Sequence, residues 1–142
     1  MSLSHDTALR RSFVLALAVP ADGKRPVEVV LVASSSVAFS DVIGGGLVDD
    51  VVTGACEGDL FEVYLDAERE AKGLPTNNRA AVLLTRLGHE ERNLLAGLRG
   101  DVLVVGLDTR GGDADLPAGV LVAACQSGLR VGVDMDAAER AP

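Results

Sequence analysis

The chain has 142 residues, of which 48% are hydrophobic and 24% charged, shares that are ordinary for a globular domain. Its formal net charge is −8, and residues 31–75 hold nine acidic and two basic side chains. Such a surface repels phosphate backbones and anionic membranes and favours basic partners or cations, or serves solubility alone. With 3% aromatic residues, the chain also lacks the stacking surfaces of single-strand nucleic-acid binders.

The length fits one domain. We expect a flexible arm at residues 1–11, the domain at 12–133 and a frayed tail at 134–142. No apolar run approaches 18 residues and no leader is visible, so we expect a cytoplasmic protein that does not span a membrane. Cys56 and Cys125 form no CxxC motif, which favours two buried free thiols over a disulfide.

The first half of the chain predicts a hairpin, a helix and a second pair of strands. Asp22-Gly23 suits a hairpin turn, and Gly44 and Gly45 can end a helix in the left-handed conformation. Phe61 belongs to an alternation of buried and wet positions that is typical of a half-exposed strand. In chain order, the predicted elements are a strand at 13–19, a turn at 20–26, a strand at 27–32, a helix at 37–43, and strands at 47–53 and 60–65.

The second half centres on a helix that follows a rigid turn. Ala80, Leu83, Leu84 and Leu87 fall at the i, i+3, i+4, i+7 spacing of one helix face, and Pro117 suits the first turn of a later helix. In chain order, this half predicts a helix from about 80 to 87, a polar turn or short helix at 89–96, a strand at 101–106, a loop at 108–115, a helix from 116 to about 127, and an edge strand at 129–133.

Together the elements predict an α+β fold. We expect one compact domain with a mostly antiparallel sheet, or a partly closed barrel, and two to three packed helices. No internal repeat is visible in the sequence.

The best candidate site is the turn before the central helix. Gly73 permits an unusual φ and Pro75 holds its neighbours extended, so Asn77, Asn78 and Arg79 stand at a helix N-terminus. Their donors suit a carboxylate, a phosphate or a partner's backbone. The alternative is structural, with Asn77 capping the helix, Asn78 bonding the turn and Arg79 pairing with an acid.

A second candidate is the acidic region before that turn. Asp49 and Asp59, together with Asp50 and Glu57, could serve as paired carboxylates or bind a divalent cation. Adjacent aspartates on a strand point to opposite faces, however, so Asp49 and Asp50 do not easily share a ligand. Solvated surface charge is the competing interpretation.

Other chemistries have little support. Residues 89–93 read His-Glu-Glu-Arg-Asn, so the second zinc ligand of a helical motif is replaced by Asn93. The glycines at 44–46 match no phosphate-binding pattern, and neither cysteine has a local base. We expect no metal, no cofactor and no catalytic residue.

Three blocks resemble the family known as domain of unknown function 3846, whose small proteins occur in bacteria, phages and mobile elements. They are Val42-Ile43-Gly44-Gly45, residues 66–80 with the Gly-Leu-Pro-x-Asn core, and Leu98-Arg99-Gly100 running into an apolar strand. They cover about residues 13–107. The resemblance implies a compact α+β fold and provides no catalytic residues, since the family has no established activity.

These observations favour a non-enzymatic protein-binding or regulatory module, with a basic partner suggested by charge and homodimerisation left open. The alternatives are a small-ligand sensor, or a small hydrolase or transferase with its site at the Gly-Leu-Pro turn. If Asp49, Asp59, Asn77 and Arg79 cluster around one cleft, a sensor or enzyme is favoured. If they are dispersed, the binding module is favoured.

Overall fold

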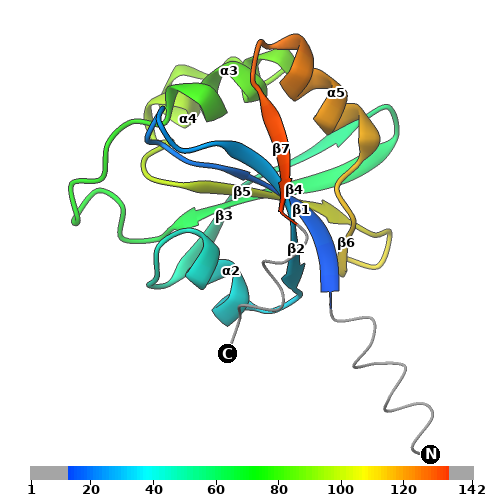
Figure 1. Cartoon of the computed structure of the whole chain (residues 1–142), viewed down its shortest axis with the longest axis horizontal. Coiled ribbons are helices and arrows are strands. Elements are labelled where there is room, and N and C mark those ends of the chain that lie inside the picture. The colour runs from blue at the N-terminus through cyan, green and yellow to red at the C-terminus, as the bar shows by residue number, and fades with distance from the viewer. Residues whose placement is uncertain (1–12, 135–142) are drawn as a thin grey trace, which may run out of the picture.

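A single β-sheet organises the described part of the chain, residues 13–134 of a computed structural model (Figure 1). The predicted arm at 1–11 and residues 135–142 of the predicted tail lie outside the described residues, whereas Asp134, which was assigned to the tail, ends a strand paired with Val30. The strands are β1 (Phe13–Val19), β2 (Val27–Ala33), β3 (Val48–Cys56), β4 (Asp59–Asp66), β5 (Val102–Leu107), β6 (Asp113–Ala114) and β7 (Val131–Asp134).

The sheet has the order β3-β4-β5-β1-β2-β7, and β6 pairs with β5. Every pairing is antiparallel except that of β2 with β7. The prediction of a mostly antiparallel α+β domain is therefore confirmed. The alternative of a partly closed barrel is not, because β3 and β7 each pair on one side only within residues 13–134.

Four helices pack on this sheet within residues 13–134, where two or three were predicted. They are α2 (Ser36–Val42), α3 (Asn78–Arg86), α4 (Arg92–Ala96) and α5 (Ala118–Gln126). The additional helix is the short α4, which the sequence left open as a polar turn. The Ser35 hydroxyl caps α2 by accepting a hydrogen bond from the Ala38 amide at 3.1 Å.

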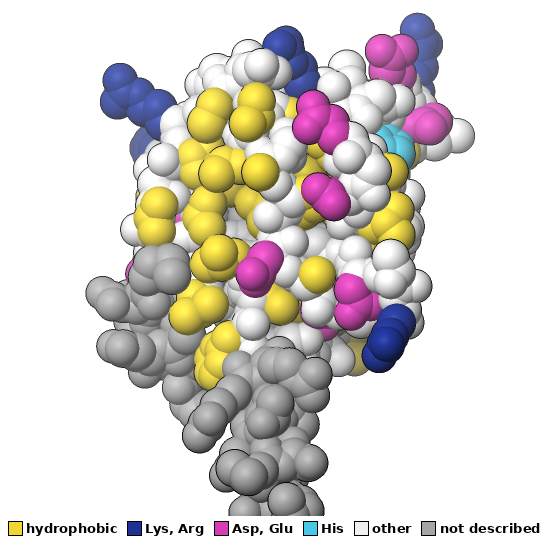
Figure 2. All heavy atoms as spheres, turned by 90° about the vertical axis from the view of Figure 1, so that its right-hand side faces the viewer, with side chains coloured by type: hydrophobic (Ala, Val, Ile, Leu, Met, Phe, Trp, Pro, Cys, Tyr) yellow, Lys and Arg dark blue, Asp and Glu magenta, His cyan; other side chains and the backbone are white. Residues whose placement is uncertain are grey.

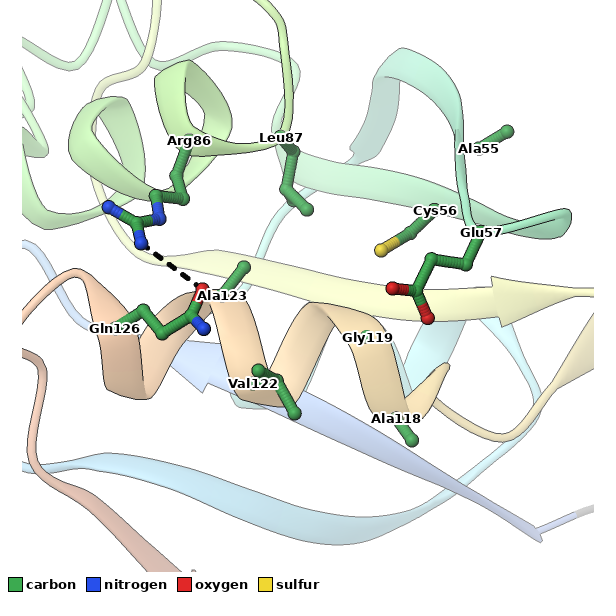
Figure 3. Close-up of a pocket in the computed structure, with 10 residues that line it drawn as sticks. All are labelled: Ala55, Cys56, Glu57, Arg86, Leu87, Ala118, Gly119, Val122, Ala123 and Gln126. Atoms are coloured by element: carbon green, nitrogen blue, oxygen red, sulfur yellow. Dashed lines mark hydrogen bonds between the residues drawn. The ribbon is translucent and has the colours of Figure 1, made fainter.

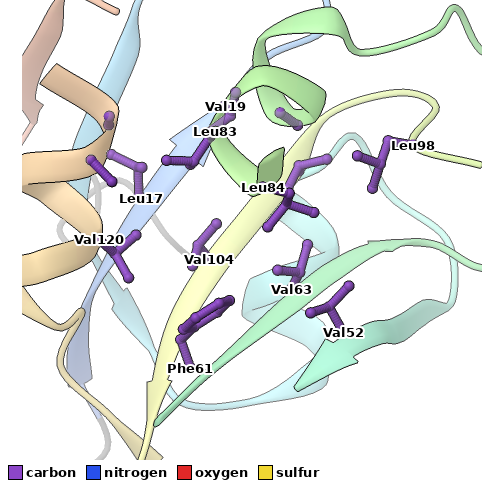
Figure 4. Packing of buried hydrophobic residues seen from close by; sticks show 14 of the residues in the cluster. Leu17, Val19, Val52, Phe61, Val63, Leu83, Leu84, Leu98, Val104 and Val120 are labelled. Atoms are coloured by element: carbon purple, nitrogen blue, oxygen red, sulfur yellow. The ribbon is translucent and has the colours of Figure 1, made fainter. Parts of the chain in front are cut away.

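The hydrophobic core has two parts, one on each face of the sheet. The larger part lies under α3, α4 and α5, and Figure 4 shows Phe61, Val63 and Val104 packing below Leu83 and Leu84. The smaller part lies against α2 and includes Phe39 and, at its margin, Tyr64; its other buried members are Val14, Ala16, Val30, Val32, Ile43, Leu103 and Val105. The period of two along β4 sends successive side chains to the two parts.

Helices α3 and α5 are structural equivalents. Residues 77–90 and 117–130 show the same succession of buried and exposed positions. Each helix ends at a glycine with positive φ, +98° at Gly88 and +83° at Gly128. The sequences of the two segments differ too much for this correspondence to be visible as a repeat, because burial constrains the pattern of apolar positions and not their identity.

Two local features differ from the prediction. Strand β3 continues to Cys56, three residues further than expected, because Glu57 (φ 52°) and Gly58 (φ 89°) form a two-residue hairpin turn. The expected loop at 108–115 contains β6. This strand can approach β5 because Gly106 has no side chain: a Cβ there would lie 2.0 Å from the carbonyl oxygen of Asp115.

Candidate functional site

Asn77 is a buried structural residue at the centre of the predicted turn. Its side chain is 0% exposed. The Oδ1 atom accepts a hydrogen bond from the Ala80 amide at 2.9 Å, while Nδ2 donates to the carbonyl oxygens of Val19 at 2.8 Å and Gly100 at 3.0 Å. These bonds cap α3 and tie it to β1 and to the entry of β5. No exposed surface of Asn77 remains for a ligand to touch.

The two residues after Asn77 have different environments. Arg79 donates to the carbonyl oxygen of Pro20 at 2.7 and 3.2 Å and to that of Asp22 at 2.7 Å. Its guanidinium thus bonds the backbone of the β1–β2 turn. An acidic side-chain partner for Arg79 had been expected from the sequence. Asn78 is exposed in the first turn of α3. Of the three turn residues, Asn78 alone presents its side chain freely to solvent.

An ion pair between Lys72 and Asp66 closes the same turn. The Nζ and Oδ2 atoms lie 2.6 Å apart, and Asp66 is 3% exposed. Burial raises the pKa of Asp66, but hydrogen bonds from Lys72 and from the Glu68 amide outweigh it and hold that pKa below its usual range. A Cβ on Gly46 would lie 2.7 Å from Lys72 Nζ, so the absence of a side chain at Gly46 leaves space for this pair.

The turn also borders a small cavity of about 280 Å³. Its lining comes from three segments that are far apart in the sequence: Ile43 and Gly44, then Asp66, Lys72, Leu74 and Pro75, then Gly100 and Asp101, joined by Ala21 and Asp22. Gly44, Gly45 and Gly73 all have positive φ, in agreement with their expected role in turns. The three segments therefore meet in space.

Asp49 and Asp59 do not meet. Asp49 pairs with Leu65 at one end of the β3–β4 hairpin, and Asp59 pairs with Cys56 at the other. Seven residues of extended strand separate these positions, roughly 20 Å. Asp49 lies 3.9 Å from Arg69 near the central turn. Asp59 thus lies apart from the central turn, and the four residues proposed to mark a sensor or enzyme cleft do not surround one cleft.

The ion pairs of residues 13–134 all lie near the central turn. They are Arg25–Asp101 at 2.8 Å, Arg69–Asp49 at 3.9 Å and Lys72–Asp66 at 2.6 Å. Near the turn, Arg69 and Arg99 also donate to backbone carbonyls. Most basic groups of this region are therefore used internally.

The opposite end of the sheet collects carboxylates without such partners. The β3–β4 turn, the loop after β5 and β6 lie side by side there, since Leu60 pairs with Leu107 and Leu107 with Asp113. We call this region the acidic end and define it by Glu57, Asp59, Glu62, Asp108, Asp113 and Asp115. None of these residues has an ion pair within residues 13–134. In segments 57–62 and 107–116 the sole basic residue is Arg110.

Several of these carboxylates are held in place by the fold. Asp115 accepts a hydrogen bond from the Leu15 amide at 2.8 Å. Asp108 accepts hydrogen bonds from the amides of Gly112 and Arg110, each at 2.8 Å, and these bonds lower its pKa. Asp108 and Asp115 are therefore held in place by backbone amides, whereas Glu57 and Asp59 at the hairpin tip are exposed.

A pocket of about 370 Å³ adjoins the acidic end on the α2 side and includes Asp50 and Phe39. The Ser34 hydroxyl donates to Asp113 at 2.5 Å, and the Tyr64 hydroxyl donates to Glu62. Burial, the bond to Glu62 and the charge of Asp113 raise the pKa of Tyr64 well above its usual range. Ser34 and Asp113 could not be recognised as neighbours from the sequence, because no local signal connects residues 79 positions apart.

A furrow runs along α5 to the acidic end. Its first part, about 450 Å³, lies between α5, the end of α3 and the hairpin tip, and its second part, about 500 Å³, lies between α5, the tip and the loop after β5. Both parts include Ala118. Figure 3 shows Glu57 and Cys56 at the start of α5, and Arg86 bonded to Gln126 at 3.2 Å at its end.

The two cysteines are free, as expected, but only Cys56 is partly buried. Cys56 is half-buried beside α5 and Cys125 is exposed, which corrects the expectation that both are buried. Burial, with Glu57 and Asp59 nearby, raises the pKa of the Cys56 thiol. His89 packs edge-on against Phe61, with ring centres 6.1 Å apart. Within residues 13–134 no three His, Cys, Asp or Glu side chains gather to hold a metal.

Comparison with family models, curated proteins and solved structures gave no match to this chain. In the part of the chain that the structure describes, none of the helices is long and apolar enough to cross a membrane.

Proposed function

We propose that this protein is a non-enzymatic binding module that uses its acidic end to bind a basic segment of a partner protein. The observation that carries this proposal is the separation of charge. The ion pairs of residues 13–134 lie near the central turn, and the carboxylates of the acidic end take part in none of them. Four of these carboxylates are exposed, and the other two, Glu62 and Asp113, are half-buried and accept hydrogen bonds from hydroxyl groups. Complementary charge of this kind raises association rates and selects partners.

The positions of the candidate residues favour binding over catalysis. The polar groups of Asn77 and Arg79 form hydrogen bonds with backbone atoms. Asp49 and Asp59 lie at opposite ends of a hairpin. General acid–base chemistry needs such groups within hydrogen-bond reach of one substrate. We therefore weigh the hydrolase or transferase alternative below the binding module.

The proposal can be tested with a matched pair of charge variants. Glu57→Gln/Asp59→Asn removes two charges from the acidic end, and Glu68→Gln/Glu70→Gln removes two exposed charges of the same spacing near the central turn. None of these four carboxylates makes a hydrogen bond or an ion pair within residues 13–134. The probe is a flexible, labelled peptide of Arg, Lys, Gly and Ser, and its binding is followed by fluorescence anisotropy.

We expect the first variant to weaken binding about tenfold and the second to change it little, since rim charge pairs contribute up to about 1 kcal/mol each. Binding should also decline with added salt. Equal effects of the two variants would assign the binding to net charge alone. No detectable binding by the unmodified protein at low salt would overturn the proposal.

The cavity at the central turn supports a second candidate, a small-ligand sensor. Three separate segments and the Asp66–Lys72 pair converge there. A screen of small charged metabolites by thermal shift tests this candidate. A ligand whose stabilisation disappears in Lys72→Met but persists in Lys24→Met would favour it over the binding module.

A further inference from the structure

We propose that the furrow along α5 is the docking groove for an amphipathic, basic helix of the partner. This inference rests on the proposed function and adds a location and a partner class to it. Three features carry it: the floor of the furrow, the exposed apolar residue at its edge, and the charge around it.

The floor of the furrow is small and apolar. Ala118, Gly119 and Ala123 line it from α5, and Leu87 lines it from the end of α3. Small side chains allow a second helix to approach closely, because interaxial distance depends on the residues at the contact. Helix α5 has nine residues, which gives about 14 Å of length, or two and a half turns of a docked helix.

Val122 stands at the edge of this floor and is 53% exposed. Helix α5 carries no charged residue, which is unusual for a helix that faces solvent along one side. Figure 2 shows this side of the molecule, where hydrophobic side chains gather beside acidic ones. Burial of Val122 against a partner would remove apolar surface from water and so stabilise the complex.

The charges around the furrow select the occupant. Glu57 borders its first part together with Arg86, which donates to Gln126, and Asp59, Asp108 and Asp115 border its second. A second copy of this chain would bring these carboxylates against their own equivalents, or against a molecule of net charge −8. An amphipathic helix fits this arrangement. Its leucine-like residues would contact the apolar floor, and lysines and arginines on the adjoining flank would face the acidic rim.

The test compares two labelled peptides of equal composition. One is a Leu/Lys peptide of about 18 residues whose leucines recur at helical spacing, and the other is its scrambled isomer. The protein variants are Val122→Gln and Val82→Gln. Val82 occupies the equivalent position of α3, is 49% exposed and does not line the furrow, and glutamine is a good helix former at both sites.

We expect the amphipathic peptide to bind about tenfold tighter than its isomer, and Val122→Gln to remove most of that difference, while Val82→Gln leaves it in place. Equal binding of the two peptides, or equal effects of the two variants, would overturn the docking groove. The proposed function would still hold in that case if Glu57→Gln/Asp59→Asn weakened the binding of both peptides. If the unmodified protein bound none of the basic peptides, both proposals would be overturned.

Discussion

Asn77 Nδ2 lies 2.8 Å from the carbonyl oxygen of Val19, 58 residues earlier in the chain. The same nitrogen bonds the carbonyl of Gly100, and the Asn77 oxygen caps α3. One buried side chain thus connects a helix start with two strand ends. The residue that the sequence offered as a ligand contact is explained by this structural role.

The first expectation concerns this residue. Asn77→Ala removes the helix cap and leaves two buried carbonyls without a donor, so we expect a loss of about 3 kcal/mol in the free energy of unfolding. Urea denaturation followed by circular dichroism measures it. Asn78→Ala is the control, because Asn78 is exposed, and it should change stability by less than about 0.5 kcal/mol. Similar losses for both variants would contradict the structural role.

A second expectation concerns the close approach of β5 and the residues after β6. In Gly106→Ala the new methyl would lie 2.0 Å from the Asp115 carbonyl oxygen and 2.8 Å from that of Ala114, both backbone atoms that cannot rotate away. We expect a loss of about 3 kcal/mol or more. Gly23→Ala meets nothing within 4 Å and should be neutral or slightly stabilising. Thermal unfolding of both variants distinguishes the two outcomes.

A third expectation concerns acid stability. The folded-state pKa of Asp66 is lowered, so its contribution is present above the ordinary carboxyl pKa of about 3.9 and disappears as pH falls through the folded value. In Lys72→Met the carboxylate stays buried but loses its cation, so its folded pKa rises. We expect acid unfolding to begin at higher pH.

Circular dichroism between pH 7 and pH 2, a range below neutrality chosen to cover carboxyl titration, measures this shift. Lys24 is the other lysine of the chain, is exposed, and makes Lys24→Met a suitable control. An unchanged acid midpoint in Lys72→Met would show that the ion pair does not set the pKa of Asp66.

A fourth expectation uses Tyr64, the single tyrosine of a chain without tryptophan. Because its pKa is raised by burial, Glu62 and Asp113, phenolate absorbance should appear only well above the ordinary value of about 10. A raised folded pKa contributes stability below the ordinary value, and that contribution is lost as pH rises through the folded one. Glu62→Gln should bring the onset to lower pH. An ordinary titration curve in the unmodified protein would contradict the geometry of this pocket.

Much of the fold could be predicted from local signals. The alternation through Phe61, the apolar run of β5 and the leucine spacing of α3 each depend on residues close in sequence, and each element is present. β6 could not be predicted in this way, because it consists of two residues and depends on the missing side chain of Gly106.

Only some features of the candidate site could likewise be predicted from the sequence. The acidity of the chain and the turn at Gly73 and Pro75 are visible in the sequence. Asp59 belongs to the acidic end, but Asp49 lies beside Arg69 near the central turn, and nothing local distinguishes the two aspartates. The charge-free stretch of α5 was a signal that could have indicated an interaction surface.

The sequence by itself determined most of the secondary structure, the α+β class and the net charge, because these follow from short-range periodicity and composition. Tertiary structure alone decided which carboxylates find cations and which do not. Ser34 reaches Asp113, and Leu60 pairs with Leu107, across separations that no local pattern encodes. The open sheet brings these distant segments to one end, and their physical proximity makes an acidic face out of scattered charges.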